Sequence, residues 1–104
     1  MNNPELKIEQ QKENEKLICK LSGWLDPNTS PQLLSKVDLT GVKTLIFDMS
    51  GVEYVFSSGI RVLLVLQKML EEKGGTIRLI NVPIQIKFVF EDTGLDEMLE
   101  NKAD

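Results

Sequence analysis

Apolar and polar residues alternate along two short stretches near the beginning of the chain, at residues 6–10 and 17–21. Alternation with a period of two is typical of β-strands that bury one face. The stretch between them, residues 11–16, is polar and mostly charged. The pattern therefore predicts two strands joined by a turn as a hairpin.

Two further strands are predicted later in the chain. Residues 44–47 form an unbroken run of apolar and β-branched residues, which is typical of a strand covered on both faces. A turn is expected directly after this strand, at residues 48–51. Residues 76–80 predict another buried strand.

Helices are predicted between these strands. A dense group of turn formers precedes a short helix from residue 31 to about residue 37, with Ser30 as its N-cap and a proline in its first turn. Residues 58–73 contain no proline and are followed by two glycines, so they predict the longest helix. Residues 84–90 alternate and are rich in β-branched and aromatic side chains, so on local grounds they favour a strand.

Strands and helices thus alternate along most of the chain. Parallel strands need crossover connections, so this order predicts an α/β fold with a mixed sheet of four to five strands and helices packed on it. With 104 residues, 41% of them hydrophobic, the chain has material for one domain, residues 1–104.

The long helix shows one departure from a simple core-facing pattern. Most of its apolar residues fall on one arc: Val62, Leu63, Leu66, Met69 and Leu70. Ile60 and Leu64 instead project toward the charged side, one turn apart, near the start of the helix. They are candidate contacts for a protein partner; the alternative is that a neighbouring element covers them.

The start of this helix carries two serines, Ser57 and Ser58, followed by Gly59. The first backbone N–H groups of a helix lack partners within the helix, and a serine oxygen can accept a hydrogen bond from them as a cap. The same N–H groups and the helix dipole also stabilise an anion. The position therefore suits both an N-cap and a phosphoryl group.

Composition excludes several classes of function. The chain has no histidine, which removes the commonest general base and metal ligand, and a net charge of −4, which opposes nucleic-acid binding. Its single cysteine, Cys19, is expected to be a buried thiol outside any disulfide or zinc site. We expect no cofactor and no metal. A serine nucleophile at Ser57 or Ser58 would lack a base.

The N-terminus has no basic and apolar signal pattern, and the longest apolar run, residues 62–66, is far short of the ~20 residues that cross a bilayer. We therefore expect a cytoplasmic protein without a membrane partner. We also expect a monomer or a weak dimer.

Three segments together resemble the anti-sigma factor antagonist family, the STAS domain shared with the cytoplasmic tails of sulfate transporters. The most specific segment is LIFDMSGV at residues 45–52 followed by VFSSGI at residues 55–60. The others are GWLDPNT at residues 23–29 and VFEDTGLD at residues 89–96. The resemblance spans nearly the whole chain. It implies a helix from residue 83 to residue 92, against the local strand pattern.

The resemblance also implies a function. In the switching members of the family, an anti-sigma factor that is also a serine kinase phosphorylates the second serine of the motif, which corresponds to Ser58, with Ser57 as second choice. The unphosphorylated form binds that anti-sigma factor, and phosphorylation ends the binding. Such a switch requires that the hydroxyl is presented to solvent. The implied partner-binding residues are Asp26, Thr29, Phe56, Ser57, Ser58, Gly59, Ile60 and Leu64.

Two points stay open within this resemblance. Many members have an acidic residue where this chain has Phe56, which is an aromatic partner contact or a core residue. Asp26 and Asp48 are implied to lie near Ser58 and shape its environment, or else each caps its own turn. The alternative function is a scaffold or ligand-sensing module of a signalling or transport complex that is not phosphorylated.

Overall fold

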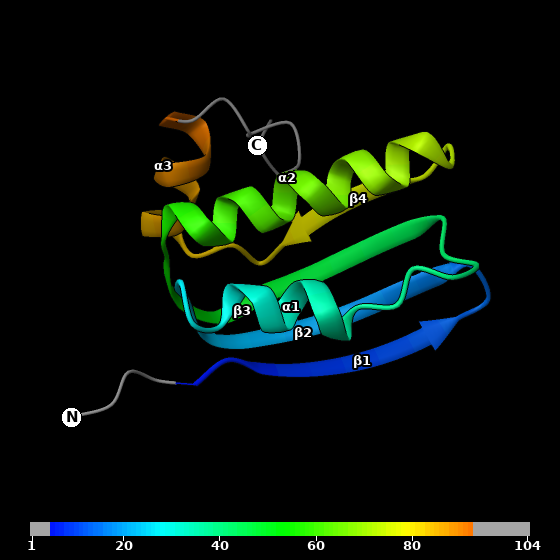
Figure 1. Cartoon of the computed structure of the whole chain (residues 1–104). Coiled ribbons are helices and arrows are strands. Elements are labelled where there is room, and N and C mark those ends of the chain that lie inside the picture. Colours follow the sequence, from blue (N-terminus) through cyan, green and yellow to red (C-terminus); the bar gives the residue numbers. More distant parts are fainter. Residues whose placement is uncertain (1–4, 93–104) are drawn as a thin grey trace.

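A computed structural model describes residues 5–92 of the chain, and Figure 1 shows how their elements are arranged. Two strands come first, followed by an alternation of helices and strands, as the sequence predicted. The elements in chain order are β1 (Lys7–Glu13), β2 (Lys16–Leu25), α1 (Ser30–Lys36), β3 (Thr44–Val55), α2 (Ser57–Glu72), β4 (Thr76–Ile80) and α3 (Ile84–Asp92).

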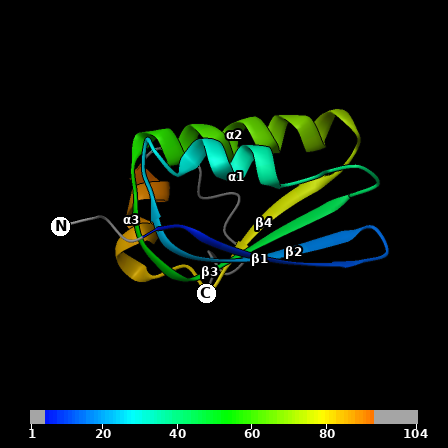
Figure 2. The same ribbon diagram turned by 60° about the horizontal axis from the view of Figure 1, so that its bottom comes forward.

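The four strands form one mixed sheet in the order β1-β2-β3-β4. β1 and β2 are the predicted antiparallel hairpin, whereas β2–β3 and β3–β4 are parallel pairs joined across helices. Helices α1 and α2 lie side by side on one face of the sheet, and α3 lies at the end where α2 begins (Figures 1 and 2). The α/β class with a mixed four-stranded sheet is therefore confirmed.

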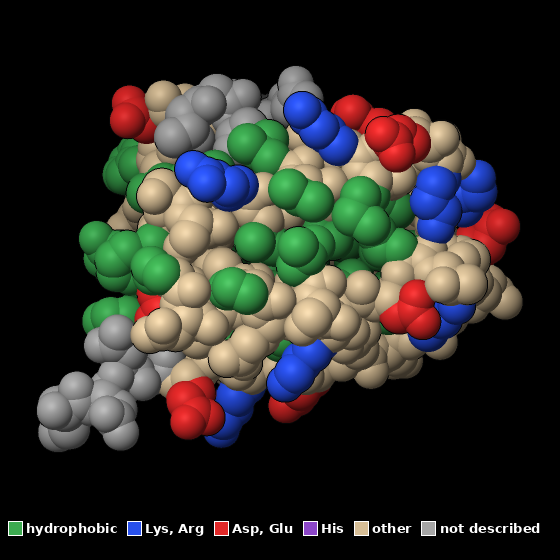
Figure 3. All heavy atoms as spheres, viewed as in Figure 1, with side chains coloured by type: hydrophobic (Ala, Val, Ile, Leu, Met, Phe, Trp, Pro, Cys, Tyr) green, Lys and Arg blue, Asp and Glu red, His purple; other side chains and the backbone are tan. Residues whose placement is uncertain are grey.

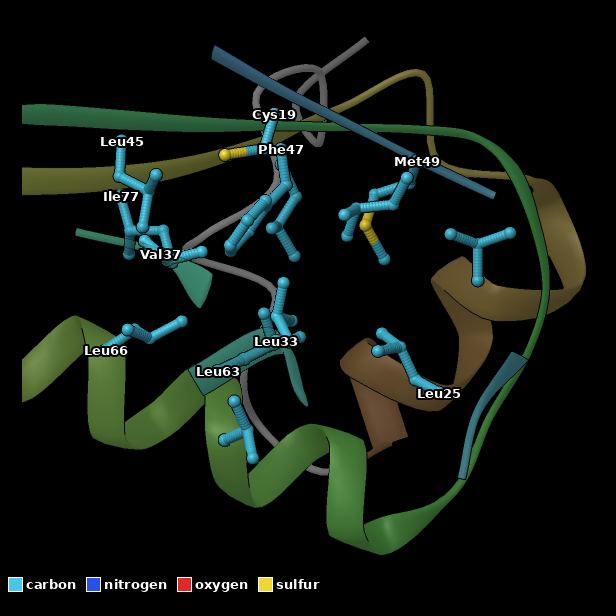
Figure 4. Close-up of a cluster of buried hydrophobic side chains, with 14 of the residues drawn as sticks. Cys19, Leu25, Leu33, Val37, Leu45, Phe47, Met49, Leu63, Leu66 and Ile77 are labelled. Atoms are coloured by element: carbon cyan, nitrogen blue, oxygen red, sulfur yellow. The ribbon is translucent and has the colours of Figure 1, made fainter. Parts of the chain in front are cut away.

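The hydrophobic core lies between the sheet and the helix pair. Leu45, Phe47 and Met49 of β3 have no exposed surface and point toward Leu33 of α1 and Leu63 of α2 (Figure 4). The intervening residues of β3 are only half-buried. The prediction that residues 44–47 are covered on both faces is therefore wrong for the described part of the chain, because α1 and α2 cover the same face.

β3 is much longer than the sequence predicted. The turn expected at residues 48–51 does not form, and the strand continues to Val55. Lys20 pairs with Asp48 but Ser22 pairs with Gly51, so β3 contains one more residue than β2 over this interval. This β-bulge accommodates the polar segment within the strand, and it explains why the segment resembled a turn.

The two later helices agree with the sequence in different ways. α2 matches its prediction within one residue at each end, although Met69, expected in the core, is 42% exposed. α3 confirms the helix implied by the resemblance, because Ile86 and Phe90 are buried one turn apart. The last part of the resembling segment, residues 93–96, lies outside the described residues.

None of the described helices is long and apolar enough to cross a membrane.

Candidate functional site

The junction between β3 and α2 is fixed to the end of β2 by its backbone. Phe56 is extended, and its N–H donates to the carbonyl oxygen of Leu25 at 2.8 Å. The carbonyl oxygen of Phe56 accepts from the N–H groups of Gly59 and Ile60, which starts the helix. Phe56 therefore occupies the N-cap position, and no side chain caps it. The prediction that a serine caps α2 is wrong.

Gly59 allows this close docking. A Cβ at this position would lie 2.8 Å from Cβ of Leu25 and 3.2 Å from Cγ1 of Val55. Real Cβ atoms essentially never approach another atom as closely as 2.8 Å, so only glycine lets the first turn of α2 lie against the end of β2 without a shift. This explains the glycine after the two serines.

Asp26 and Thr29 form the turn that follows β2. Oδ1 of Asp26 accepts from the backbone N–H groups of Asn28 and Thr29, each at 2.9 Å. The hydroxyl of Thr29 donates to the carbonyl oxygen of Trp24 and accepts from the N–H of Asp26. Both side chains are buried, so they shape the backbone beside the start of α2. For Asp26, the interpretation as a cap of its own turn is the one observed.

The start of α1 differs from its prediction by one residue. Thr29 occupies the N-cap position, whereas Ser30 is the first helical residue. The hydroxyl of Ser30 is buried and makes no hydrogen bond with any described residue. Ser30 is therefore not the N-cap, because the hydrogen bonds between Asp26 and Thr29 end the preceding turn one residue earlier.

The two serines of α2 have different environments. Ser57 is exposed, whereas Ser58 is half-buried. Oγ of Ser58 is fully buried and has no hydrogen-bond partner among residues 5–92. The expectation that this hydroxyl is presented to solvent is therefore wrong for the described structure. Reaching it requires rotation of the side chain or opening of the first turn of α2.

Asp48 does not belong to this site. It lies in the middle of β3, seven residues before Val55, and strands rise ~3.3 Å per residue, so roughly 20 Å of strand separates it from the start of α2. Its Oδ1 accepts from the N–H of Ser50 and from Nδ2 of Asn81. Burial raises the pKa of the Asp48 carboxyl, but these hydrogen bonds and the positive charge of Lys20 lower it more, so the pKa lies below its usual value. Asp48 therefore caps its own segment.

Ile60 and Leu64, the two apolar residues that broke the pattern of α2, are both half-buried. Ile60 packs against the hydrophobic core. Each therefore keeps part of its surface exposed, and neither is fully exposed.

An aromatic cluster beside the site was not predicted from the sequence. The rings of Trp24, Tyr54 and Phe56 lie in mutual contact, with centroid distances of 5.7 Å, 6.2 Å and 4.6 Å between the three pairs. Tyr54 is 51% exposed, and the other two are half-buried. The register of β2 and β3 creates this cluster by pairing Trp24 with Tyr54. Phe56 is thus an aromatic surface residue.

Cys19 is buried in the core as expected. Burial raises the pKa of its thiol to about 12, so the thiol stays protonated and unreactive near neutral pH. Within the described ranges, no group of acidic or cysteine residues is arranged to hold a metal ion.

A family model for the STAS domain matches residues 5–103. The chain therefore belongs to the STAS domain family, as the resemblance implied. The match includes the β2 end, the bulged half of β3 and the start of α2.

Solved structures with the same fold include bacterial regulators. The unphosphorylated form of SpoIIAA, an anti-sigma factor antagonist of Bacillus, is 25% identical, with a TM-score of 0.78 over 90% of this chain and 84% of that one. An anti-sigma factor antagonist from Mycobacterium paratuberculosis is 22% identical, with a TM-score of 0.78 over 95% and 88%.

The fold also occurs within a much larger transporter. The murine anion transporter Slc26a9 is 26% identical over 86% of this chain, with a TM-score of 0.64, but the match covers only 16% of the transporter.

Proposed function

We propose that this chain is an anti-sigma factor antagonist, which binds an anti-sigma factor with serine kinase activity while unphosphorylated and is switched off by phosphorylation at Ser58. The observation that carries the proposal is the construction of the α2 start. Two serines stand on a helical turn that Gly59 and the backbone of Leu25 fix in place. SpoIIAA, which has the same fold, has been solved in both unphosphorylated and phosphorylated forms.

The proposed binding surface surrounds this turn. Phe56, Ser57, Ile60 and Leu64 each keep exposed surface and supply the direct contacts. Asp26, Thr29 and Gly59 are buried and act by positioning the backbone. We assign them this supporting role in place of direct contact with the partner.

The burial of the Ser58 hydroxyl means that its side chain has to turn outward before a kinase reaches it, and it also restricts where a phosphoryl group can lie. A phosphoryl group adds about −1.5 to −2 charge at neutral pH. The pocket that holds Oγ has no hydrogen-bond partner for it among the described residues, so it cannot solvate a dianion. The phosphorylated side chain must therefore turn outward, where it lies within the proposed surface and displaces the partner.

Ser57 is the competing phosphorylation site. It is already exposed, so a kinase needs no local rearrangement to reach it. Phosphate at Ser57 would also lie beside Phe56 on the proposed surface. The two serines are adjacent, and only site mapping separates them.

The test measures how this chain binds a cognate anti-sigma factor with serine kinase activity. We expect Ser58→Ala to bind the partner as the wild type does. Ser58→Asp should bind at least about tenfold more weakly, because the buried site disfavours a charge and the carboxylate turns outward into the interface. Ser35→Asp adds the same charge at an exposed serine of α1 outside the proposed surface, and it serves as the control. Equal affinity of Ser58→Ala and Ser58→Asp, with both variants folded, contradicts the switch.

A second candidate function is a STAS scaffold or ligand-sensing module that is not phosphorylated. The buried position of the Ser58 hydroxyl favours this alternative, and the likeness to a domain of Slc26a9 agrees with it. It predicts partner binding that does not depend on ATP and kinase. Binding that persists after prolonged incubation with the active kinase and ATP supports the scaffold.

The remaining expectations from the sequence are part of the same proposal. We propose a binding module without enzymatic activity, cofactor, nucleic-acid partner or membrane partner, in which residues 1–104 form a single STAS domain that works in the cytoplasm as a monomer or weak dimer. The absence of histidine supports the lack of enzymatic activity, and the net charge of −4 supports the lack of a nucleic-acid partner.

A further inference from the structure

The aromatic cluster of Trp24, Tyr54 and Phe56 has a carboxylate attached to its edge. Nε1 of Trp24 donates a hydrogen bond to Oε1 of Glu53 at 3.3 Å. Glu53 is exposed, and no lysine or arginine within residues 5–92 is paired with it. The cluster therefore combines ring faces with a fixed negative charge.

A second β-bulge places this carboxylate. Gly23 pairs with Val52 and Trp24 pairs with Tyr54, so Glu53 is an extra residue in β3 without a partner in β2. Bulges re-aim side chains and are common next to functional sites. Trp24 pairs with Tyr54, and Glu53 precedes Tyr54 in β3, so Glu53 lies beside the indole of Trp24. The same bulge therefore positions the ring of Tyr54 and the carboxylate of Glu53.

The cluster is not required to complete the core. The core between the sheet and the helix pair is already filled by aliphatic side chains and two phenylalanines, Phe47 and Phe90, that have no exposed surface. Tyr54 in contrast exposes half of its surface. In the space-filling view, hydrophobic side chains reach the surface at the end of the molecule where α2 begins (Figure 3). Phe56 connects the cluster directly to Ser57.

We propose that Tyr54, Phe56 and Glu53 bind a cationic side chain, a guanidinium group above all, that the protein partner presents. A cation over an aromatic ring is attracted by the negative face of the ring, and arginine is the residue that most often makes this contact. The second oxygen of Glu53 is available to accept a hydrogen bond from the same group. The net charge of −4 favours a basic partner surface.

The inference rests on the proposed function for the identity of the partner, although its chemistry can be tested without it. Trp24 is the only tryptophan of the chain, so intrinsic fluorescence and the indole N–H resonance report on the cluster directly. The probe is N-acetyl-arginine amide, titrated into the whole chain. N-acetyl-norleucine amide, which lacks the charge, is the matched neutral probe.

We expect a saturable change with the arginine probe at roughly tens of millimolar, and a smaller response to the neutral probe. Tyr54→Ala and Glu53→Gln are each expected to weaken the response about two- to fivefold. Phe88→Ala, which removes an aromatic side chain 62% exposed on α3, is the control and leaves the response unchanged.

Two results would overturn this proposal. One is no saturable change with the arginine probe in the folded wild-type chain. The other is an equal response to the neutral probe, which would identify the cluster as a site for an apolar side chain. Neither probe involves kinase or phosphate, so failure here leaves the phosphorylation switch standing, and failure of the switch leaves this site standing.

Discussion

The two ends of the parallel pair β2–β3 are built differently. From Lys16 to Lys20, the register with Thr44–Asp48 is regular, and one face packs under the helices. From Lys20 to Leu25, the register shifts twice, and aromatic rings reach the surface. The regular end holds the core together, whereas the irregular end positions the start of α2.

This difference separates the part of the sheet that holds the core from the part that carries the proposed binding site. Each extra residue in β3 bends the strand and changes which side chains reach the surface. The irregular end gains Glu53 beside Trp24, and its last residues dock the start of α2 onto Leu25. We expect substitutions at the regular end to change stability and substitutions at the irregular end to change binding.

The largest contrast in stability is expected between two aromatic residues of β3. Phe47→Ala removes a ring with no exposed surface and should lower the free energy of unfolding by about 3–5 kcal/mol. Tyr54→Ala removes a half-exposed ring and should cost less than about 1 kcal/mol. Urea denaturation measures both. Similar losses for the two variants would refute the division between the ends.

A smaller loss is expected where the start of α2 packs against the end of β2. Gly59→Ala places a methyl group 2.8 Å from Cβ of Leu25 and should cost about 1–3 kcal/mol. It should also weaken partner binding, because the first turn of α2 has to move. Ser57→Ala is the control and should stay within about 0.5 kcal/mol of the wild type. Unchanged stability of Gly59→Ala would mean that the junction is not close-packed.

Cys19 predicts how stability depends on alkaline pH. The pKa of its thiol is about 12 in the folded chain against 9.0 as the ordinary value, so between these values only the unfolded chain loses the proton. The free energy of unfolding should therefore fall as pH rises above about 9, and the Cys19 thiol should contribute up to ~1.4 kcal/mol per pH unit to this fall. Comparing the pH dependence of the wild type with that of Cys19→Ala isolates the contribution. Parallel curves would show that the thiol is accessible.

The smallest effect is expected at Ser58. Its hydroxyl is buried without a hydrogen-bond partner among the described residues, so Ser58→Ala removes an unsatisfied polar group. The variant should be as stable as the wild type or up to about 1 kcal/mol more stable. A loss larger than this, seen by thermal denaturation, would show that the hydroxyl has a partner in solution.

The sequence predicted those elements whose periodicity is local. The hairpin and α2 follow from alternation and from the glycines that end the helix. Residues 84–90 carry a strand pattern, yet they form α3 because Ile86 and Phe90 are buried one turn apart, and only the family resemblance indicated this.

The sequence did not predict the features that depend on strand register. The bulge at residues 48–51 resembles a turn locally, and the pairing of Trp24 with Tyr54 depends on two register shifts that no local pattern reveals. The motif placed the two serines at the helix start correctly. The N-cap position of Phe56 depends on its hydrogen bond to Leu25, which is a tertiary contact, and the burial of the Ser58 hydroxyl is likewise a property of the folded chain that no local pattern shows.

The most direct test of the central claim is to map the phosphorylation site. The chain is incubated with ATP and a cognate serine kinase of the anti-sigma factor class, and the peptide that contains both serines is analysed by mass spectrometry. We predict one added phosphoryl group located on Ser58, retained in Ser57→Ala and absent from Ser58→Ala. An active kinase that binds the chain yet leaves both serines unmodified would contradict the switch.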